Sequence, residues 1–133
     1  MIRRVLVLGV ALGVLGGLSC KDSTGPVAGT LKVKLTMPGA NSGLDGAILF
    51  TLTGPTAPGA ASAGGPGLRV FHQALAPTMK VAVTGTLASG AVVMTFAVDD
   101  VRQRYTATLE QVAATAGYQL RSSLNGYSLS VTR

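Results

Sequence analysis

The sequence predicts an all-β protein, an antiparallel two-sheet sandwich of roughly eight strands that follows a helical leader. In several segments apolar and polar residues alternate with a period of two, as in strands with one buried face. β-branched residues are abundant, whereas the Glu, Lys and Arg that long amphipathic helices need in bulk are scarce. Eighteen glycines and six prolines interrupt the 133-residue chain at short intervals, which is typical of strands joined by turns.

The first 19 residues have the layout of a secretory signal peptide. Arg3 and Arg4 precede an apolar stretch over residues 5–18, and the small residue Ser19 comes directly before Cys20, the only cysteine. Residues 5–19 number only 15, fewer than the roughly 20 that a transmembrane helix needs.

This arrangement resembles a bacterial lipoprotein precursor. The resemblance implies cleavage after Ser19, lipidation of the Cys20 thiol, and anchoring to a membrane of the bacterial cell envelope, on its periplasmic or outer surface. Proteins of this class usually have Leu three positions before the cysteine and a small residue two positions before it, where this chain has Gly17 and Leu18. An uncleaved anchor and a plain secreted protein are the alternatives.

Behind the leader the chain is expected to form one domain. Residues 20–29 are interpreted as the lipidated N-terminus and a flexible tether, and residues 30–133 as the β-sandwich. Without Arg3 and Arg4, nine of the eleven basic residues remain against five acidic ones, and they form no run. A scattered surplus of four charges is typical of a solvated surface and argues against nucleic-acid binding.

The first strands follow from alternation. Residues 30–37 and 46–53 alternate clearly, and residues 68–75 predict a third, less regular strand. Between them, residues 54–67 are all Gly, Pro, Ala, Ser or Thr and predict a mobile loop, because they bury too little apolar surface to offset the entropy of ordering. Residues 101–116 are ambiguous, because Tyr105, Leu109 and Val112 also have helical spacing. Thr106 and Thr108 favour a strand over residues 104–111, followed by a turn or a short helical piece through residues 113–114.

A hairpin is predicted around Ser89 and Gly90. A two-residue turn there pairs residues 78–87 with residues 91–98 and places the apolar side chains of both on one face. Residues 46–50 and 90–98 loosely resemble the strands of cohesin-like and other immunoglobulin-like extracellular modules. That resemblance implies a sandwich fold and carries no function.

A second hairpin is predicted around Asn125 and Gly126, which favour a type I′ turn. The resulting register pairs Leu120 with Val131 and continues to the chain end. It places Tyr118 and Tyr127 on the apolar face, so both are expected in the core.

Candidate sites for chemistry are few. Tyr105 is left as the aromatic residue available for binding, and Asp99 and Asp100 form the only pair of adjacent acids. Adjacent residues of an extended chain point to opposite faces, so the pair does not form a two-carboxylate catalytic site. We expect a solvated turn in which it pairs with Arg102 or Arg104.

The remaining chemical alternatives are a weak Ca²⁺ site and a histidine-based enzyme. A Ca²⁺ site would need Asn41 and Asp45 beside Asp99 and Asp100, because calcium takes six to eight oxygen ligands. His72 is the only histidine and lies in an apolar strand. The sequence therefore predicts no metal, no cofactor and no enzyme activity.

The expected function is a membrane-anchored envelope lipoprotein with a non-enzymatic binding or structural sandwich. Its partners would be membrane lipid through acylated Cys20, together with an envelope protein or a glycan. The alternatives are a small carbohydrate- or cell-wall-binding module that uses Tyr105 and neighbouring loops and, in third place, a secreted hydrolase.

Overall fold

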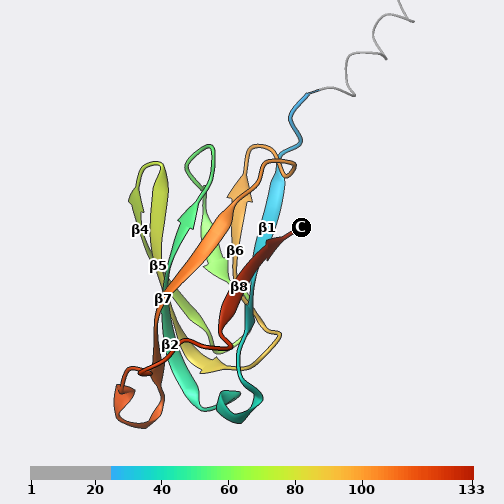
Figure 1. The fold of residues 1–133 in the computed structure, drawn as a ribbon. Coiled ribbons are helices and arrows are strands. Elements are labelled where there is room, and N and C mark those ends of the chain that lie inside the picture. Colours follow the sequence, from blue (N-terminus) through green and yellow to red (C-terminus); the bar gives the residue numbers. More distant parts are fainter. Residues whose placement is uncertain (1–24) are drawn as a thin grey trace, which may run out of the picture.

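The computed structural model describes residues 25–133 and confirms the all-β two-sheet sandwich (Figure 1). Along the chain lie eight strands and two short 3-10 turns: β1 (Gly29–Thr36), η1 (Gly39–Asn41), β2 (Asp45–Thr53), β3 (Ala61–Ala63), β4 (Arg69–Leu75), β5 (Thr78–Leu87), β6 (Val92–Val98), β7 (Thr106–Ala114), η2 (Ala116–Tyr118) and β8 (Ser128–Thr132). The expected signal peptide, with Ser19 and Cys20, lies outside the described residues. Within residues 25–133 no helix is long and apolar enough to cross a membrane.

Each sheet has four antiparallel strands. We call the sheet with the order β3-β6-β1-β8 sheet A and the sheet with the order β4-β5-β2-β7 sheet B. Among the described strands, β4 and β5 are the only neighbours in sequence that are also paired in a sheet. Every other connection crosses from one sheet to the other, so most loops are arches over an end of the sandwich.

The two ends of the sandwich carry different segments (Figure 1). Residues 25–28 enter β1 at the end where the β6–β7 turn lies, and the Val101 N–H donates a hydrogen bond of 2.8 Å to the carbonyl of Val27 there. We call this the entry end. The β1–β2, β5–β6 and β7–β8 connections lie at the opposite, far end.

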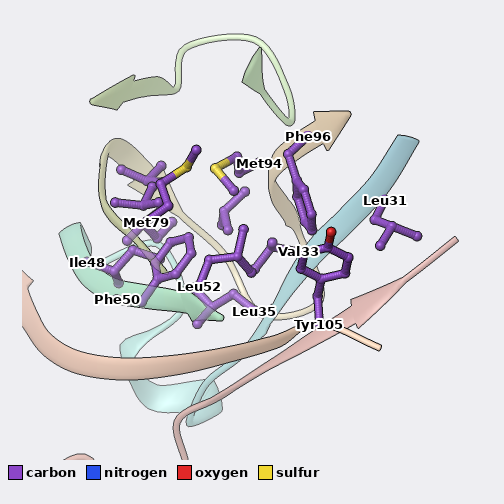
Figure 2. Packing of buried hydrophobic residues seen from close by; sticks show 14 of the residues in the cluster. Leu31, Val33, Leu35, Ile48, Phe50, Leu52, Met79, Met94, Phe96 and Tyr105 are labelled. Atoms are coloured by element: carbon purple, nitrogen blue, oxygen red, sulfur yellow. The ribbon is translucent and has the colours of Figure 1, made fainter. Parts of the chain in front are cut away.

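Alternation places one set of side chains from each sheet in a shared core. Figure 2 shows this packing, with Val33 and Leu35 of β1 facing Phe50 and Leu52 of β2. Fully burying a side chain of this size contributes about 1.5–3 kcal/mol. The core is formed by the inward positions that period two predicts, including Leu31, Met37, Ile48, Met79, Val81, Val83, Met94, Phe96 and Val98.

The hairpin expected around Ser89 and Gly90 is wrong. β5 pairs with β4 and β2 in sheet B, whereas β6 pairs with β1 and β3 in sheet A. The turn itself exists, since the Ala91 N–H donates to the carbonyl of Ala88 at 3.2 Å. The apolar faces of β5 and β6 meet across the core, because period two fixes which face is buried but not which strand lies alongside.

The hairpin expected around Asn125 and Gly126 is wrong for the same reason. The turn forms, with Gly126 at φ +84° and the Tyr127 N–H donating to the carbonyl of Leu124 at 3.0 Å. However, β8 pairs with β1, and Leu120 forms a bridge with Ala113 at the end of β7. The chain therefore crosses from sheet B to sheet A between these two pairings.

The segment 54–67 contains a strand that the sequence reading did not predict. β3 pairs with β6, with Ala61 opposite Phe96. A side-chain carbon at Gly64 would lie 2.1 Å from the carbonyl oxygen of Val92, so glycine is required for this close approach. The mobility of the segment stays a prediction. Further along, β7 overlaps the strand expected at 104–111 but runs from Thr106 to Ala114, through the positions where a turn was expected. The short helical turn lies later, at Ala116–Tyr118.

Candidate functional site

Tyr105, the aromatic residue expected to bind a ligand, lies in the core. It is only 5% exposed, and its ring packs edge-to-face on Phe96 with 5.4 Å between ring centroids. Figure 2 shows the two rings beside Val33. Its hydroxyl lies 2.9 Å from Oγ1 of Thr56, and Gly54 leaves room for the ring. The ring is thus a packing element and offers no exposed face for stacking.

Asp100 and Arg102 form the turn pair that the sequence predicted. Nε and Nη2 of Arg102 donate to the two carboxylate oxygens at 2.9 and 3.0 Å, and the Arg102 N–H donates at 3.1 Å. These bonds, led by the side-chain bond from Arg102, hold the pKa of Asp100 well below its usual range. Asp99 is exposed beside them.

This turn also holds the segment that enters β1. Nη2 of Arg102 donates to the carbonyl of Gly25 at 2.9 Å, and the Val27 N–H donates to Asp100 at 3.4 Å. A side-chain carbon at Gly29 would lie 2.6 Å from Cγ1 of Val101, so the glycine permits close packing. Asp100 and Arg102 therefore hold the entry segment against the β6–β7 turn, a role that the sequence does not predict. Arg102 and Gly25 are 77 residues apart, and Val27 and Asp100 are 73 residues apart, so no local sequence pattern predicts these contacts.

Asn41 and Asp45, weighed as calcium ligands, meet in a different arrangement. The carboxylate of Asp45 is buried and accepts hydrogen bonds from Nε of Arg121 at 2.7 Å and from the hydroxyl of Tyr127 at 2.5 Å. Nδ2 of Asn41 donates to the same hydroxyl at 2.8 Å. Arg121 thus supplies the positive charge that this carboxylate needs. Asp99 and Asp100 lie at the entry end, away from this cluster.

The surroundings of Asp45 raise the pKa values of its two hydrogen-bond donors, Arg121 and Tyr127. Burial and the hydrogen bond to Asp45 raise the pKa of Tyr127. The side-chain hydrogen bond to Asp45 raises the pKa of Arg121. Both residues stay protonated in the physiological range, so their hydrogen bonds to Asp45 persist. We call these three residues the strut, because they tie residues 121–127 to the start of β2. Within residues 25–133 no group of three or more His, Cys, Asp or Glu side chains could hold a metal ion.

His72 is exposed on β4, opposite Val81. Within the described part of the chain, no side-chain hydrogen bond joins it to a serine or to a carboxylate. A serine–histidine–acid arrangement is therefore not assembled around it. His72 is an exposed residue of the edge strand β4 and needs no chemical role to account for its position.

The most site-like feature is a hollow at the far end, which we call the Tyr118 hollow. Its volume is about 370 Å³, and its lining comprises Gly46, Gly67, Arg69, Thr84, Gly85, Thr86, Thr115 and Tyr118. Tyr118 is 71% exposed, contrary to the expectation that it lies in the core. Arg69 is also exposed at the start of β4.

The expected hairpin excludes this hollow, because it pairs residues 119–124 with the chain end and turns Tyr118 into the core. Gly117, with φ +66°, lies in η2 directly before Tyr118, which itself has φ +51°. Glycine beside a tyrosine at the end of a strand pattern was the available signal for a loop.

A second, apolar hollow lies on the outer face of sheet B. Ala47, Leu49, Ala82, Ala113 and Leu120 are among the residues that line it, and Phe71 pairs with Ala82 at its margin. Leu120 is 59% exposed and Phe71 is 55% exposed. This face thus has an apolar stripe that runs from β4 to the segment after β7.

Comparisons with protein-family models, with curated proteins and with solved structures found no match to this chain. The resemblances to lipoprotein precursors and to cohesin-like modules therefore stay predictions from the sequence.

Proposed function

We propose that this chain is a cell-envelope lipoprotein, anchored through acylated Cys20, whose sandwich is a non-enzymatic binding domain. The proposal combines the leader pattern with one structural observation. The entry segment is held at one end of the sandwich by Asp100 and Arg102, whereas the Tyr118 hollow lies at the other end. An anchor at the entry end would leave the far end free.

The lengths of the tether and of β5 support an anchor at the entry end and a binding site at the far end. Cys20 lies five residues before Gly25, a distance that an extended chain spans in at most about 18 Å. The ten residues of β5 run from the entry end to the hollow and cover about 33 Å. The hollow would therefore be presented well away from the lipid surface, on a domain attached by two or more acyl chains, which suffice for stable anchoring.

The proposal is tested by intact-mass analysis of protein extracted from membranes, comparing wild type with Cys20→Ala. We expect the wild-type mass to exceed that of residues 20–133 by a diacylglyceryl group and by a further acyl chain. Cys20→Ala should lose these additions, and Ser23→Ala, a matched change in the tether, should keep them. Wild-type protein in the aqueous fraction with an unmodified thiol, or uncleaved in the membrane, would refute the proposal.

A further inference from the structure

We infer that the Tyr118 hollow is a binding site for an acidic saccharide, a sugar unit that carries a carboxylate. This inference rests on the proposed function, since a cell envelope is where a domain meets glycan polymers. It assigns the binding to Tyr118 and Arg69 rather than to Tyr105, which is buried.

The hollow is built where both central strands of sheet B are irregular. The register of β2 shifts between Asp45 and Ala47 against both β5 and β7, so Gly46 and Gly85 lie at bulges. Bulges are common beside functional sites, where they redirect the chain. Here they form the floor of the hollow.

The two glycines also bring the walls close. A side-chain carbon at Gly46 would lie 2.9 Å from Oγ1 of Thr115, in the β7–β8 connection. A side-chain carbon at Gly85, where φ is +134°, would lie 2.5 Å from the carbonyl oxygen of Gly67, in the β3–β4 connection. A side chain at either position would displace the neighbouring connection. The two glycines therefore allow the β3–β4 and β7–β8 connections to lie close to the floor of the hollow.

Tyr118 provides an exposed aromatic surface in one wall. Its left-handed backbone, with φ +51°, is unfavourable for a residue other than glycine, and such conformations cluster at functional sites. An aromatic ring combines a large apolar face with a polar hydroxyl. The apolar C–H face of a sugar ring matches such a surface.

Arg69 provides the charge in the opposite wall. Within residues 25–133 none of the salt bridges involves Arg69, and its planar guanidinium matches a carboxylate in two parallel hydrogen bonds. The hydroxyls of Thr84, Thr86 and Thr115 are donors and acceptors for sugar hydroxyls. Together the lining offers one apolar face, one cation and several neutral hydroxyls, which is the complement of an acidic sugar.

The size of the hollow limits the ligand. A volume of about 370 Å³ is at the lower end for small-molecule sites. It suits one or two sugar units of a longer polymer. A nucleotide shares the aromatic and anionic features, so the test below includes one as a competing ligand.

The test is a calorimetric titration of the detergent-solubilised full chain. The probes are trigalacturonate, the neutral galactose trimer of the same length, and uridine monophosphate. We expect the acidic trimer to bind at least about tenfold more tightly than either other probe. Weaker binding of trigalacturonate than of uridine monophosphate, or equal binding of the two trimers, would overturn the inference.

Variants locate the site. Tyr118→Ala and Arg69→Gln should each weaken binding of trigalacturonate by about tenfold, and Tyr118→Phe should retain it. Lys34→Gln removes the same charge from sheet A and should leave binding unchanged. If Tyr118→Ala does not fold, the affinity of Arg69→Gln for trigalacturonate tests the site instead. An equal loss in Arg69→Gln and Lys34→Gln would indicate diffuse charge attraction and refute the site.

The two proposals fail separately. Absence of trigalacturonate binding at millimolar concentration, with acylated Cys20 found in the membrane, would overturn this inference alone. Binding that depends on Tyr118 and Arg69, with an unmodified Cys20 thiol, would overturn the anchoring and keep the site.

Discussion

The outer faces of the two sheets have opposite chemistry. On sheet A most outward side chains are hydroxyls and two lysines, beside Val92 and Ala97 of β6. The polar ones are Thr30, Lys32, Lys34 and Thr36 from β1, Thr95 from β6, and Ser128, Ser130 and Thr132 from β8. On sheet B they include Phe71, Ala82, Leu49, Ala47 and Ala113, with Leu120 lying against them. Exposed apolar stripes of this kind often mark contact surfaces, whereas a face of threonines and lysines is readily solvated.

The edges of the two sheets also differ. Residues 115–127 leave β7 and turn back along its end, where Leu120 pairs with Ala113 and the Arg121 N–H donates to the carbonyl of Val112 at 2.8 Å, so these residues cover that edge of sheet B. The edge strands of sheet A are β3 and β8. Sheet B therefore combines this edge cover with an apolar stripe and the Tyr118 hollow.

The largest expected effect comes from breaking the strut that holds this cover. Asp45→Ala removes the acceptor of Arg121 and Tyr127, and we expect a loss of about 3 kcal/mol in the free energy of unfolding. Urea denaturation measures it. Lys34→Ala on sheet A should change stability by less than about 0.5 kcal/mol. A loss in Asp45→Ala no larger than that of the control would show that the cover is held by other contacts.

A smaller effect is expected from exchanging the character of the two faces. Phe71→Thr should lower the fluorescence of a bound hydrophobic dye and cost less than about 1 kcal/mol, because the ring is already half exposed. Thr30→Phe, on β1, should raise the dye signal. If neither substitution changes dye binding, the apolar stripe of sheet B is not the exposed surface that distinguishes the two faces.

The smallest effect concerns pH. On the outer face of sheet B, Glu110 accepts two hydrogen bonds of 2.8 Å from Nζ of Lys80 and one from the hydroxyl of Thr51. The bonds from Lys80, then the bond from Thr51, lower the pKa of Glu110. β1, β3, β6 and β8 contain no Asp or Glu, so the strands of sheet A have no counterpart.

The sign follows from linkage. A carboxyl with a lowered folded-state pKa stabilises the fold above its ordinary value of about 4.3, and this contribution is lost as pH falls through the lowered pKa. The stability difference between wild type and Glu110→Gln should therefore shrink as urea midpoints are measured from about pH 6 down to about pH 2. Ser130→Ala, on sheet A, should show no such trend. A constant difference for Glu110→Gln would mean that its ion pair contributes nothing.

Alternation predicted which side chains form the core, but it could not predict which strands pair. Leu87 and Val98 are both buried, as expected, yet they belong to different sheets. A buried face is a local property of a strand. Its neighbours are decided by whether a short turn, such as the one at Ser89, continues one sheet or crosses to the other.

The tyrosines show the same limit for the candidate site. Tyr105 was expected to bind a ligand but lies beneath Gly54, whereas Tyr118 was expected in the core but lies at the far end in an exposed loop. Asp100 and Arg102 are close in sequence, so their pairing was predicted correctly. Asp45 and Arg121 are 76 residues apart, and their contact depends on the crossing of residues 115–127, which the expected hairpin excluded.

The attachment of the entry segment also determines how the domain resists force. β1 lies between β6 and β8, paired with both. Tension between Gly25 and the far end of the sandwich would act along the axis of β1, so both ladders would be loaded in shear and many hydrogen bonds would have to break together. Before that load reaches β1, the bonds from Arg102 and Val27 take up the first strain. If Cys20 anchors the chain as proposed, this geometry would let the domain withstand a pull on its far end.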